Sequence, residues 1–392
     1  MQQQLISLNP DLKQLQDKGY EIMISGGYVV IHHIPYVNGD REVKYGTLIS
    51  QLTMQSATLT GPPNTHAIYF MGEVPCHKDG TPMNEILNSS PNQPLHNELM
   101  GNHYFSSRPT SGTYKDHYDK FKRYIDLLGA PAKSLDRDAT ARTYKPVISD
   151  EETVFQYLDT NASRANITHL NDKFKGHKVG IIGLGGTGSY ILDLVSKAAV
   201  SEIHIFDGDR FSTHNAFRSP GAASVDDLSK LSSKTEYFYN IYSRIHKGVI
   251  PHEVFVNEKT RHLLQELNFV FLCVDNNVVR WQIIKILLEL KISFIDVGLG
   301  VTETDGQLTG ILRTTTGTKD KNDHLEKRIS SEDSIDNDYV TNIQIAELNA
   351  LNAVQAVIKW KKIVGFYQDR KLEHHSTYSI NISQLLNGDT TA

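Results

Sequence analysis

Residues 150–392 alternate short apolar runs with longer stretches in which apolar residues recur at helical intervals. The apolar runs are rich in β-branched and aromatic residues and read KVGIIG, EIHIFD, FVFLCVD and SFIDVG. Strands that alternate with amphipathic helices are typical of right-handed β-α-β crossovers, which set successive strands parallel to one another. The pattern therefore predicts an α/β domain over residues 150–392, built on a mainly parallel sheet.

Two further segments belong to this domain. Residues 314–338 are almost free of apolar side chains, and this composition predicts a mobile crossover loop. Residues 342–367 carry apolar side chains on one helical face and have Gly365 near their end, so they predict a long helix.

Residues 1–145 have a different pattern, which predicts a smaller α+β domain. The expected elements are a hairpin over 20–37 with its turn at Gly26 and Gly27, strands over 47–59 and 66–75, and a helix over 113–128. The polar residues 130–150 include two prolines and predict a linker between the two domains.

Composition narrows the classes of function. The chain of 392 residues has a formal net charge of −5, which does not favour a nucleic-acid partner. Two cysteines cannot build a disulfide framework, and no secretory signal or apolar run of about 20 residues is present. We therefore expect a cytoplasmic protein without a membrane span.

A glycine-rich turn follows the first strand of the α/β domain. Gly183, Gly185, Gly186 and Gly188 separate that strand from a helix, and Asp207 ends the next strand. Glycines let backbone N–H groups approach a phosphate, and an acid at the second strand end can bind ribose hydroxyls. A Rossmann-like nucleotide site is thus expected, although glycines needed only for tight helix–sheet packing would give the same spacing. A dinucleotide and ATP fit equally well up to this point.

A polar series after Asp207 favours ATP. Its members are Asn215, Arg218, Lys234 and Asp275. A dehydrogenase has no need of the two cations in this series, Arg218 and Lys234. An enzyme that makes an acyl-adenylate needs basic side chains around the triphosphate and an acid that holds Mg²⁺.

In these motifs the segment from about 155 to 365 resembles the ThiF/MoeB-type adenylyltransferases and the adenylation domains of ubiquitin-activating enzymes. The matching pieces are the glycine loop Gly183–Gly188, Asp207 and Asp209, Asn215 and Arg218, Lys234, and Asp275 with Arg280. The resemblance implies that Asp207 binds ribose, that Asp209 shapes the same strand end, and that Asp275 coordinates Mg²⁺. It further implies that Asn215, Arg218 and Lys234 hold the triphosphate.

The resemblance also implies a homodimer. Arg164 stands where the family has an arginine that crosses to the ATP of the partner subunit, and the helix predicted over 342–367 resembles the family's closing helix near the dimer interface.

The sequence departs from the family at its cysteines. The C-x-x-C pairs that hold a structural zinc in many relatives are absent, and the loop over 301–340 has no cysteine for a thioester. Cys273 lies in an apolar run and is expected to be structural. Cys76, beside His77 and Lys78, is a candidate for thioester formation if its thiol is exposed and a nearby cation lowers its pKa. A structural Cys76 is the alternative.

The domain over 1–145 has an unassigned role, which we expect to be recognition of a partner or substrate. Its hairpin, strands and cysteine faintly resemble the ubiquitin-conjugating fold. A metal site of His66, Cys76 and His77 is one hypothesis, and exposed or hydrogen-bonded histidines are the other.

The resemblance predicts ATP- and Mg²⁺-dependent adenylation of the C-terminal glycine carboxylate of a ubiquitin-like protein, with a conjugating enzyme as a further partner. The extra domain and the missing zinc cysteines favour a bacterial ubiquitin-like conjugation or antiphage pathway. Adenylation of a small-molecule or tRNA-base carboxylate and a non-catalytic nucleotide-binding scaffold are the alternatives.

Overall fold

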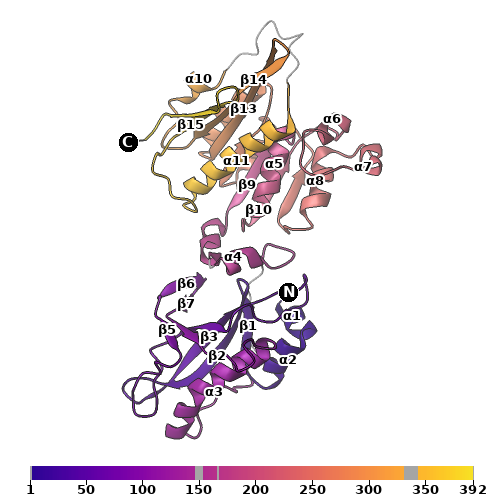
Figure 1. Cartoon of the computed structure of the whole chain (residues 1–392). Coiled ribbons are helices and arrows are strands. Elements are labelled where there is room, and N and C mark those ends of the chain that lie inside the picture. The colour runs from indigo at the N-terminus through magenta and orange to yellow at the C-terminus, as the bar shows by residue number, and fades with distance from the viewer. Residues whose placement is uncertain (1, 146–152, 166, 331–342, 392) are drawn as a thin grey trace. The chain divides into compact units, whose positions relative to one another are not determined.

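The computed structural model describes residues 2–145, 153–165, 167–330 and 343–391. The chain forms two compact units, residues 1–172 and residues 173–392 (Figure 1). Each unit has its own sheet and its own apolar core.

In the second unit, eight described strands form one sheet in the order β11-β10-β9-β12-β13-β14-β15-β16. The strands are β9 (Lys178–Ile182), β10 (Glu202–Phe206), β11 (Val249–His252), β12 (Phe269–Leu272), β13 (Ser293–Thr304), β14 (Gln307–Gly317), β15 (His375–Ser379) and β16 (Gln384–Gly388). The five strands from β11 to β13 run parallel, and β13 to β16 pair antiparallel. The predicted α/β class with a mainly parallel sheet is therefore confirmed.

Helices cover both faces of the parallel strands. These helices are α5 (Gly186–Val195), α8 (Lys234–Tyr242), α9 (Asn277–Glu289) and α11 (Ala346–Ile363). The second unit also contains the short helices α6 (Thr213–Ala216), α7 (Val225–Ser229), α10 (Leu325–Arg328) and η2 (Arg261–Leu264), and η1 (Thr168–Phe174) spans the boundary between the units. Successive residues of a strand face opposite sides, so Ile181 packs with α5, α8 and α11 while Ile182 packs with α9. Burial on both faces explains why these strands read as continuous apolar runs.

The strand order reverses around β9. The chain passes from β9 to β10 and β11 on one side, then crosses back to β12 on the other side of β9. In open α/β sheets, ligands bind at such a reversal, outside the carboxyl ends of the strands. The fold therefore points to the ends of β9, β10 and β12.

In the first unit, six of the described strands form an antiparallel sheet in the order β1-β2-β3-β4-β8-β5, and β6 pairs with β7. Its elements are α1 (Gln2–Leu8), α2 (Pro10–Asp17), β1 (Glu21–Ser25), β2 (Tyr28–Val37), β3 (Val43–Gln51), β4 (Ala67–Met71), β5 (Leu87–Ser89), β6 (Gln93–His96), β7 (Leu99–Gly101), β8 (His103–Ser106), α3 (His117–Leu135) and α4 (Thr160–Arg164). Helix α3 packs its apolar side on the sheet through Phe121, Tyr124 and Leu128. The predicted hairpin is confirmed, with φ of 55° at Gly26 and 80° at Gly27.

Two expectations about loops were wrong in part, although residues 318–324 and 136–145 do lie outside the helices and strands. The predicted crossover loop begins inside β14, because Thr314, Thr315 and Thr316 are β-forming residues that pair with β13 and β15. Its last part, residues 331–338, lies outside the described residues. The predicted linker over 130–150 is helical as far as Leu135, where Ala132 is buried against the sheet, and residues 146–150 lie outside the described part.

Candidate functional site

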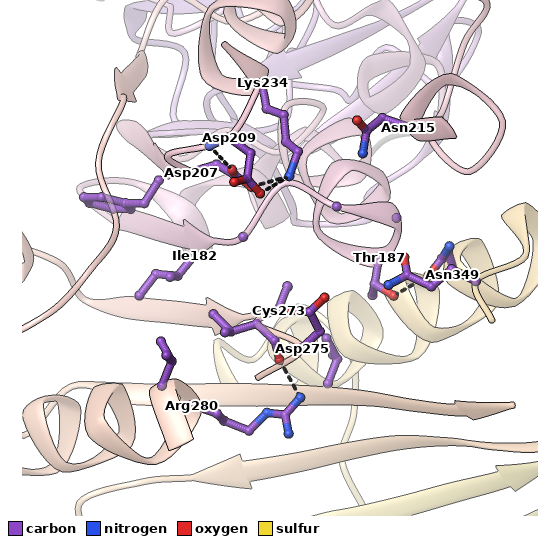
Figure 2. A pocket seen from close by; sticks show the side chains of 18 of the residues that line it. Ile182, Thr187, Asp207, Asp209, Asn215, Lys234, Cys273, Asp275, Arg280 and Asn349 are labelled. Carbon is purple, nitrogen blue, oxygen red and sulfur yellow. Dashed lines mark hydrogen bonds and ion pairs between the residues drawn. The ribbon is translucent and has the colours of Figure 1, made fainter. Parts of the chain in front are cut away.

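A cleft of about 480 Å³ lies at the carboxyl ends of β9, β10 and β12 (Figure 2). Among its lining residues are the predicted Gly183, Gly185, Gly186, Asp207, Asp209, Asn215, Arg218, Lys234, Asp275 and Arg280, together with Thr187, Phe255, Cys273, Gly298, Asn349 and Asn352. Sequence positions about 170 residues apart, from Gly183 to Asn352, thus meet at one site.

Three of the four loop glycines are required by packing. A Cβ atom on Gly183, whose φ is 91°, would lie 2.7 Å from the carbonyl oxygen of Cys273, and one on Gly188 would lie 1.8 Å from the carbonyl oxygen of Gly183. A Cβ atom on Gly186 would lie 2.0 Å from the amide nitrogen of Asn349. Gly188 serves this packing and is not among the residues that line the cleft.

Gly185 is different, because a Cβ atom there would meet nothing within 4 Å. The residue lines the cleft and is the N-cap of α5. The first N–H groups of a helix have no partner inside the helix and carry a partial positive charge. The open space at Gly185 therefore gives an anion access to the helix N-terminus.

Asp207 is fixed at the end of β10. Its carboxylate accepts hydrogen bonds from the backbone N–H of Leu184 at 2.7 Å and of Asp209 at 2.9 Å, and the residue is 7% exposed. These bonds join the end of β10 to the glycine loop after β9. The acid is thereby held beside the loop rather than pointing freely into solvent.

Lys234 lies next to Asp207 at the end of β10. Its ammonium nitrogen lies 2.7 Å from a carboxylate oxygen of Asp209 and 3.4 Å from one of Asp207 (Figure 2). The lysine side chain is almost fully buried, whereas that of Asp209 is more than half exposed. In this arrangement the ammonium offsets one of the two negative charges, and Asp209 turns its remaining surface to the cleft.

Asn215 and Arg218 place unused donors in the cleft wall. The Oδ1 atom of Asn215 accepts from the backbone N–H of Ser212 at 3.0 Å, while its Nδ2 atom is buried without a partner among the described residues. The Nε atom of Arg218 is likewise buried without a partner among the described residues. Unpaired buried donors are costly, so this wall is suited to a ligand that offers acceptors.

Asp275 follows β12 and lines the cleft with an exposed side chain (Figure 2). Within the described part of the chain, its carboxylate makes no hydrogen bond or ion pair. Free carboxylate oxygens are the ligands that Mg²⁺ prefers. No group of three or more acidic, histidine or cysteine side chains with metal-binding geometry occurs among the described residues, so Asp275 would need ligand oxygens to complete a coordination sphere.

A buried ion network supports the loop that carries Asp275. Arg280 donates to the carbonyl oxygen of Val274 and to the side chain of Asn277, on both sides of Asp275. Its Nε atom lies 3.1 Å from Asp296, which is fully buried and also accepts from Arg313 at 2.6 Å. Arg280 thus acts on the loop and not as a solvated surface charge.

Cys273 lies next to this network. Its pKa is raised strongly, first by burial and then by the negative charge of Asp296. A thiol with a raised pKa stays protonated and unreactive, as expected for a structural cysteine.

Two predicted site residues lie in the first unit instead. Arg164 ends α4 with an exposed side chain. Cys76 is 2% exposed, and its pKa is raised by burial and by the acids Asp79 and Glu73. The expectation of an exposed thiol with a lowered pKa is therefore wrong, because the segment packs against Val37 and is lined by acids rather than by a cation.

The hypothesis of a metal site at Cys76 finds no support in the described residues. The ring of His66 lies 3.0 Å from the hydroxyl of Ser106, and that of His77 lies 3.3 Å from the carboxylate of Glu85. No helix in the described ranges is both long enough and apolar enough to cross a bilayer.

Sequence reasoning missed Asn349 and Asn352, two cleft residues on the buried side of α11. Their spacing of three places them on one helical face. Asparagines at core positions of an otherwise apolar stripe are the signal that could have indicated them. It also missed Phe255, a residue that lines the cleft, is 62% exposed and has its ring next to Gly208.

Comparison with known proteins places this site in a family. A family model described as "ThiF family" matches residues 159–386, and one described as "Domain of unknown function (DUF6791)" matches residues 10–160. A relative from Saccharomyces cerevisiae, "Adenylyltransferase and sulfurtransferase UBA4", is 29% identical over 140 residues, which are 35% of this chain and 31% of that protein. "Ubiquitin-like modifier-activating enzyme 5" of Gallus gallus is 21% identical over 211 residues, which are 48% of this chain and 53% of that protein.

The matches therefore span about a third to a half of the length of these curated relatives. Among solved structures, E. coli MccB with ATP is 18% identical with a TM-score of 0.48, and the match covers 59% of this chain and 72% of that one. Since the ThiF model matches more than half of the sequence, the chain belongs to the ThiF family.

Proposed function

We propose that this chain binds ATP in the cleft and transfers AMP to a carboxylate, which is the C-terminal glycine carboxylate of a ubiquitin-like protein. The observation that carries the proposal is the set of unused donors around the open N-terminus of α5, namely Asn215 Nδ2 and Arg218 Nε. Phosphate oxygens offer the acceptors that such donors lack.

The two ends of the cleft suit different parts of ATP. Asp207 and Asp209 mark the end where ribose hydroxyls would find acceptors, beside the exposed ring of Phe255. The triphosphate would lie along Gly185 toward Arg218 and Asn215. Contact of Lys234 with the phosphates stays a prediction, since its ammonium already pairs with Asp207 and Asp209.

Asp275 would hold Mg²⁺, with phosphate oxygens and water as the remaining ligands. When bound, the metal neutralises charge that develops on the departing pyrophosphate. The residues of the chain position the reactants. Arg280 and Asp296 keep the Asp275 loop in place, and Arg218 offers a cation to the triphosphate.

The reaction balances without an acid or a base from the protein. An oxygen of the ionised carboxylate attacks the α-phosphorus, a new phosphorus–oxygen bond forms, and the bond to the β-phosphate oxygen breaks. Pyrophosphate leaves with the electron pair. Catalysis then rests on alignment and on neutralising the phosphate charge, which is what a rigid cleft with fixed donors supplies.

The name of the chicken relative supports a ubiquitin-like protein as the substrate, and the name of the yeast relative supports transfer of an adenylyl group. The resemblance of the sequence motifs supports a homodimer in which Arg164 acts on the ATP of the partner subunit. The extra domain and the missing zinc cysteines favour a bacterial conjugation or antiphage pathway. We expect the first unit to recognise a partner such as a conjugating enzyme.

Pyrophosphate exchange tests the proposal against its alternatives. Exchange of labelled pyrophosphate into ATP is expected when a ubiquitin-like protein ending in glycine is added, and not when the same protein lacks that residue. Exchange that depends on tRNA or on a small carboxylic acid would favour the second substrate class. ATP binding without exchange under any of these conditions would favour the scaffold.

A further inference from the structure

A second, smaller pocket of about 160 Å³ lies between α11 and the antiparallel strands β14, β15 and β16. Thr314 of β14 is paired with Val297 of β13, which belongs to the same apolar core as the buried side of α11. Residues directly opposite each other share one side of a sheet, so Thr314 faces the helix. In the described structure, the residues that line this pocket and those that line the cleft have no member in common.

Three oxygen atoms of this pocket are buried without a hydrogen-bond partner among the described residues. They are Oγ1 of Thr314, Oε1 of Gln355 and Oε2 of Glu373. Thr314 is 4% exposed and Glu373 is 6% exposed, so solvent hardly reaches either side chain. The oxygens of Gln355 and of an ionised Glu373 can only accept, and a threonine hydroxyl can also accept. Buried acceptors without a donor are costly, so the pocket suits a ligand that is rich in N–H groups.

The charges around the pocket allow that ligand to be a cation. The ammonium nitrogen of Lys362 lies 2.8 Å from Oε1 of Glu373, and that of Lys359 lies 2.9 Å from a carboxylate oxygen of Asp369. Two carboxylates thus balance the two ammonium groups, and Oε2 of Glu373 stays available. His374 also lines the pocket, and burial lowers its pKa, so its ring adds no positive charge near pH 7.

The rim of the pocket is apolar. Ile358 of α11 is 41% exposed and Leu385 of β16 is 52% exposed, and both line the pocket. An aliphatic stem can cover such side chains while its polar head reaches buried oxygens. A guanidinium group spreads five N–H donors over a plane and is more weakly hydrated than an ammonium group. It can therefore serve acceptors that come from three separate elements of the fold.

We infer that this pocket binds a guanidinium group carried on an aliphatic stem. The N–H groups donate to Glu373 Oε2, Gln355 Oε1 and Thr314 Oγ1, and the stem leaves between Ile358 and Leu385. A free alkylguanidine and an arginine side chain of a peptide share this chemistry. The site goes beyond the proposed function, since neither ATP nor a carboxylate takes part in it.

The test is a titration of the full chain, labelled with ¹³C at its isoleucine methyl groups, with N-butylguanidinium. We expect the Ile358 methyl resonance to shift with a dissociation constant of about 1 mM, as is reasonable for so small a ligand. Ile363 is the control, because it is 39% exposed on the same helix and does not line the pocket. Its methyl resonance should not move. Replacing each of the two isoleucines by valine assigns the resonances.

Two further ligands define the chemistry and the source of the guanidinium group. N-butylurea has a similar shape without the charge, and it should bind at least about tenfold more weakly because its hydrogen bond to Glu373 is no longer between two ions. N-acetylarginine N-methylamide carries the same group on a peptide unit. Tighter binding of this compound than of N-butylguanidinium indicates an arginine of a peptide, and weaker binding indicates a free alkylguanidine.

The Thr314→Val variant separates binding from stability. It removes one of the unpartnered oxygens and keeps the shape of the side chain. The affinity for N-butylguanidinium should fall about fivefold to tenfold, whereas the melting temperature should rise because a buried hydroxyl without a partner is gone. Thr377→Val is the matched control, since Thr377 of β15 is next to Ser376 in the strand, faces the opposite side of the sheet and does not line the pocket. It should leave the affinity unchanged.

The inference is overturned if the Ile358 methyl resonance does not move, or if N-butylguanidinium and N-butylurea bind equally well. The pocket then holds water only. Unchanged affinity of the Thr314→Val variant would also overturn it, because the hydroxyl would not face the ligand. None of these measurements involves ATP, so their results do not depend on whether the chain adenylates a carboxylate.

Discussion

Replacing Asp275 by alanine should reduce pyrophosphate exchange at least about a hundredfold and leave the fold intact. The side chain is exposed and unpaired in the described structure, so its removal breaks no internal contact. The variant lacks the carboxylate that we propose as a ligand of Mg²⁺. The measurement is exchange activity at saturating ATP, with thermal unfolding of the same preparation as the check on stability.

The matched control for this variant is Asp226→Ala. Asp226 is an equally exposed acid in the first turn of α7 and does not line the cleft. Its replacement should leave exchange unchanged. Normal exchange by the Asp275→Ala enzyme would remove this residue from the mechanism.

The Asp296→Ala variant is expected to lose about 3–5 kcal/mol of unfolding free energy in the second unit. Asp296 is fully buried between the guanidinium groups of Arg280 and Arg313, and its removal leaves both charges without their counter-ion. Urea unfolding followed by tryptophan fluorescence reports on this unit, because Trp281 and Trp360 both belong to it.

The control for stability is Asp320→Ala, which removes an exposed acid after β14 and should shift the transition by no more than about 0.5 kcal/mol. A small effect of Asp296→Ala would mean that water or a rearranged loop compensates the two arginines. The network would then not be what holds the Asp275 loop.

The parallel half of the sheet could be predicted because burial on both faces leaves a strong local pattern. The runs that became β9, β10, β12 and the first half of β13 are mostly apolar, and each adjoins a stretch with helical spacing. The antiparallel half could not be predicted, since β14, β15 and β16 are polar or half-exposed. Their pairing is decided by neighbours distant in the sequence rather than by local composition.

Some residues of the site could likewise be predicted from the sequence, and others could not. The glycine loop, Asp207 and the series from Asn215 to Asp275 follow strand ends, so topology brings them together once the strand order is known. The ion network could not be foreseen, because the pairing of Gly298 with Arg313 fixes which arginine reaches Asp296. The burial of Cys76 depends likewise on its pairing with Val37 in the folded unit.

Isotope transfer tests the central claim most directly. A ubiquitin-like protein whose C-terminal carboxylate carries ¹⁸O is incubated with the chain, ATP and Mg²⁺, and hydroxylamine is added to cleave the activated product at its carbonyl carbon. If the carboxylate attacks the α-phosphate, mass spectrometry will find one ¹⁸O atom in the released AMP. AMP without the label, or the label in inorganic phosphate beside ADP, would contradict adenylation at this cleft.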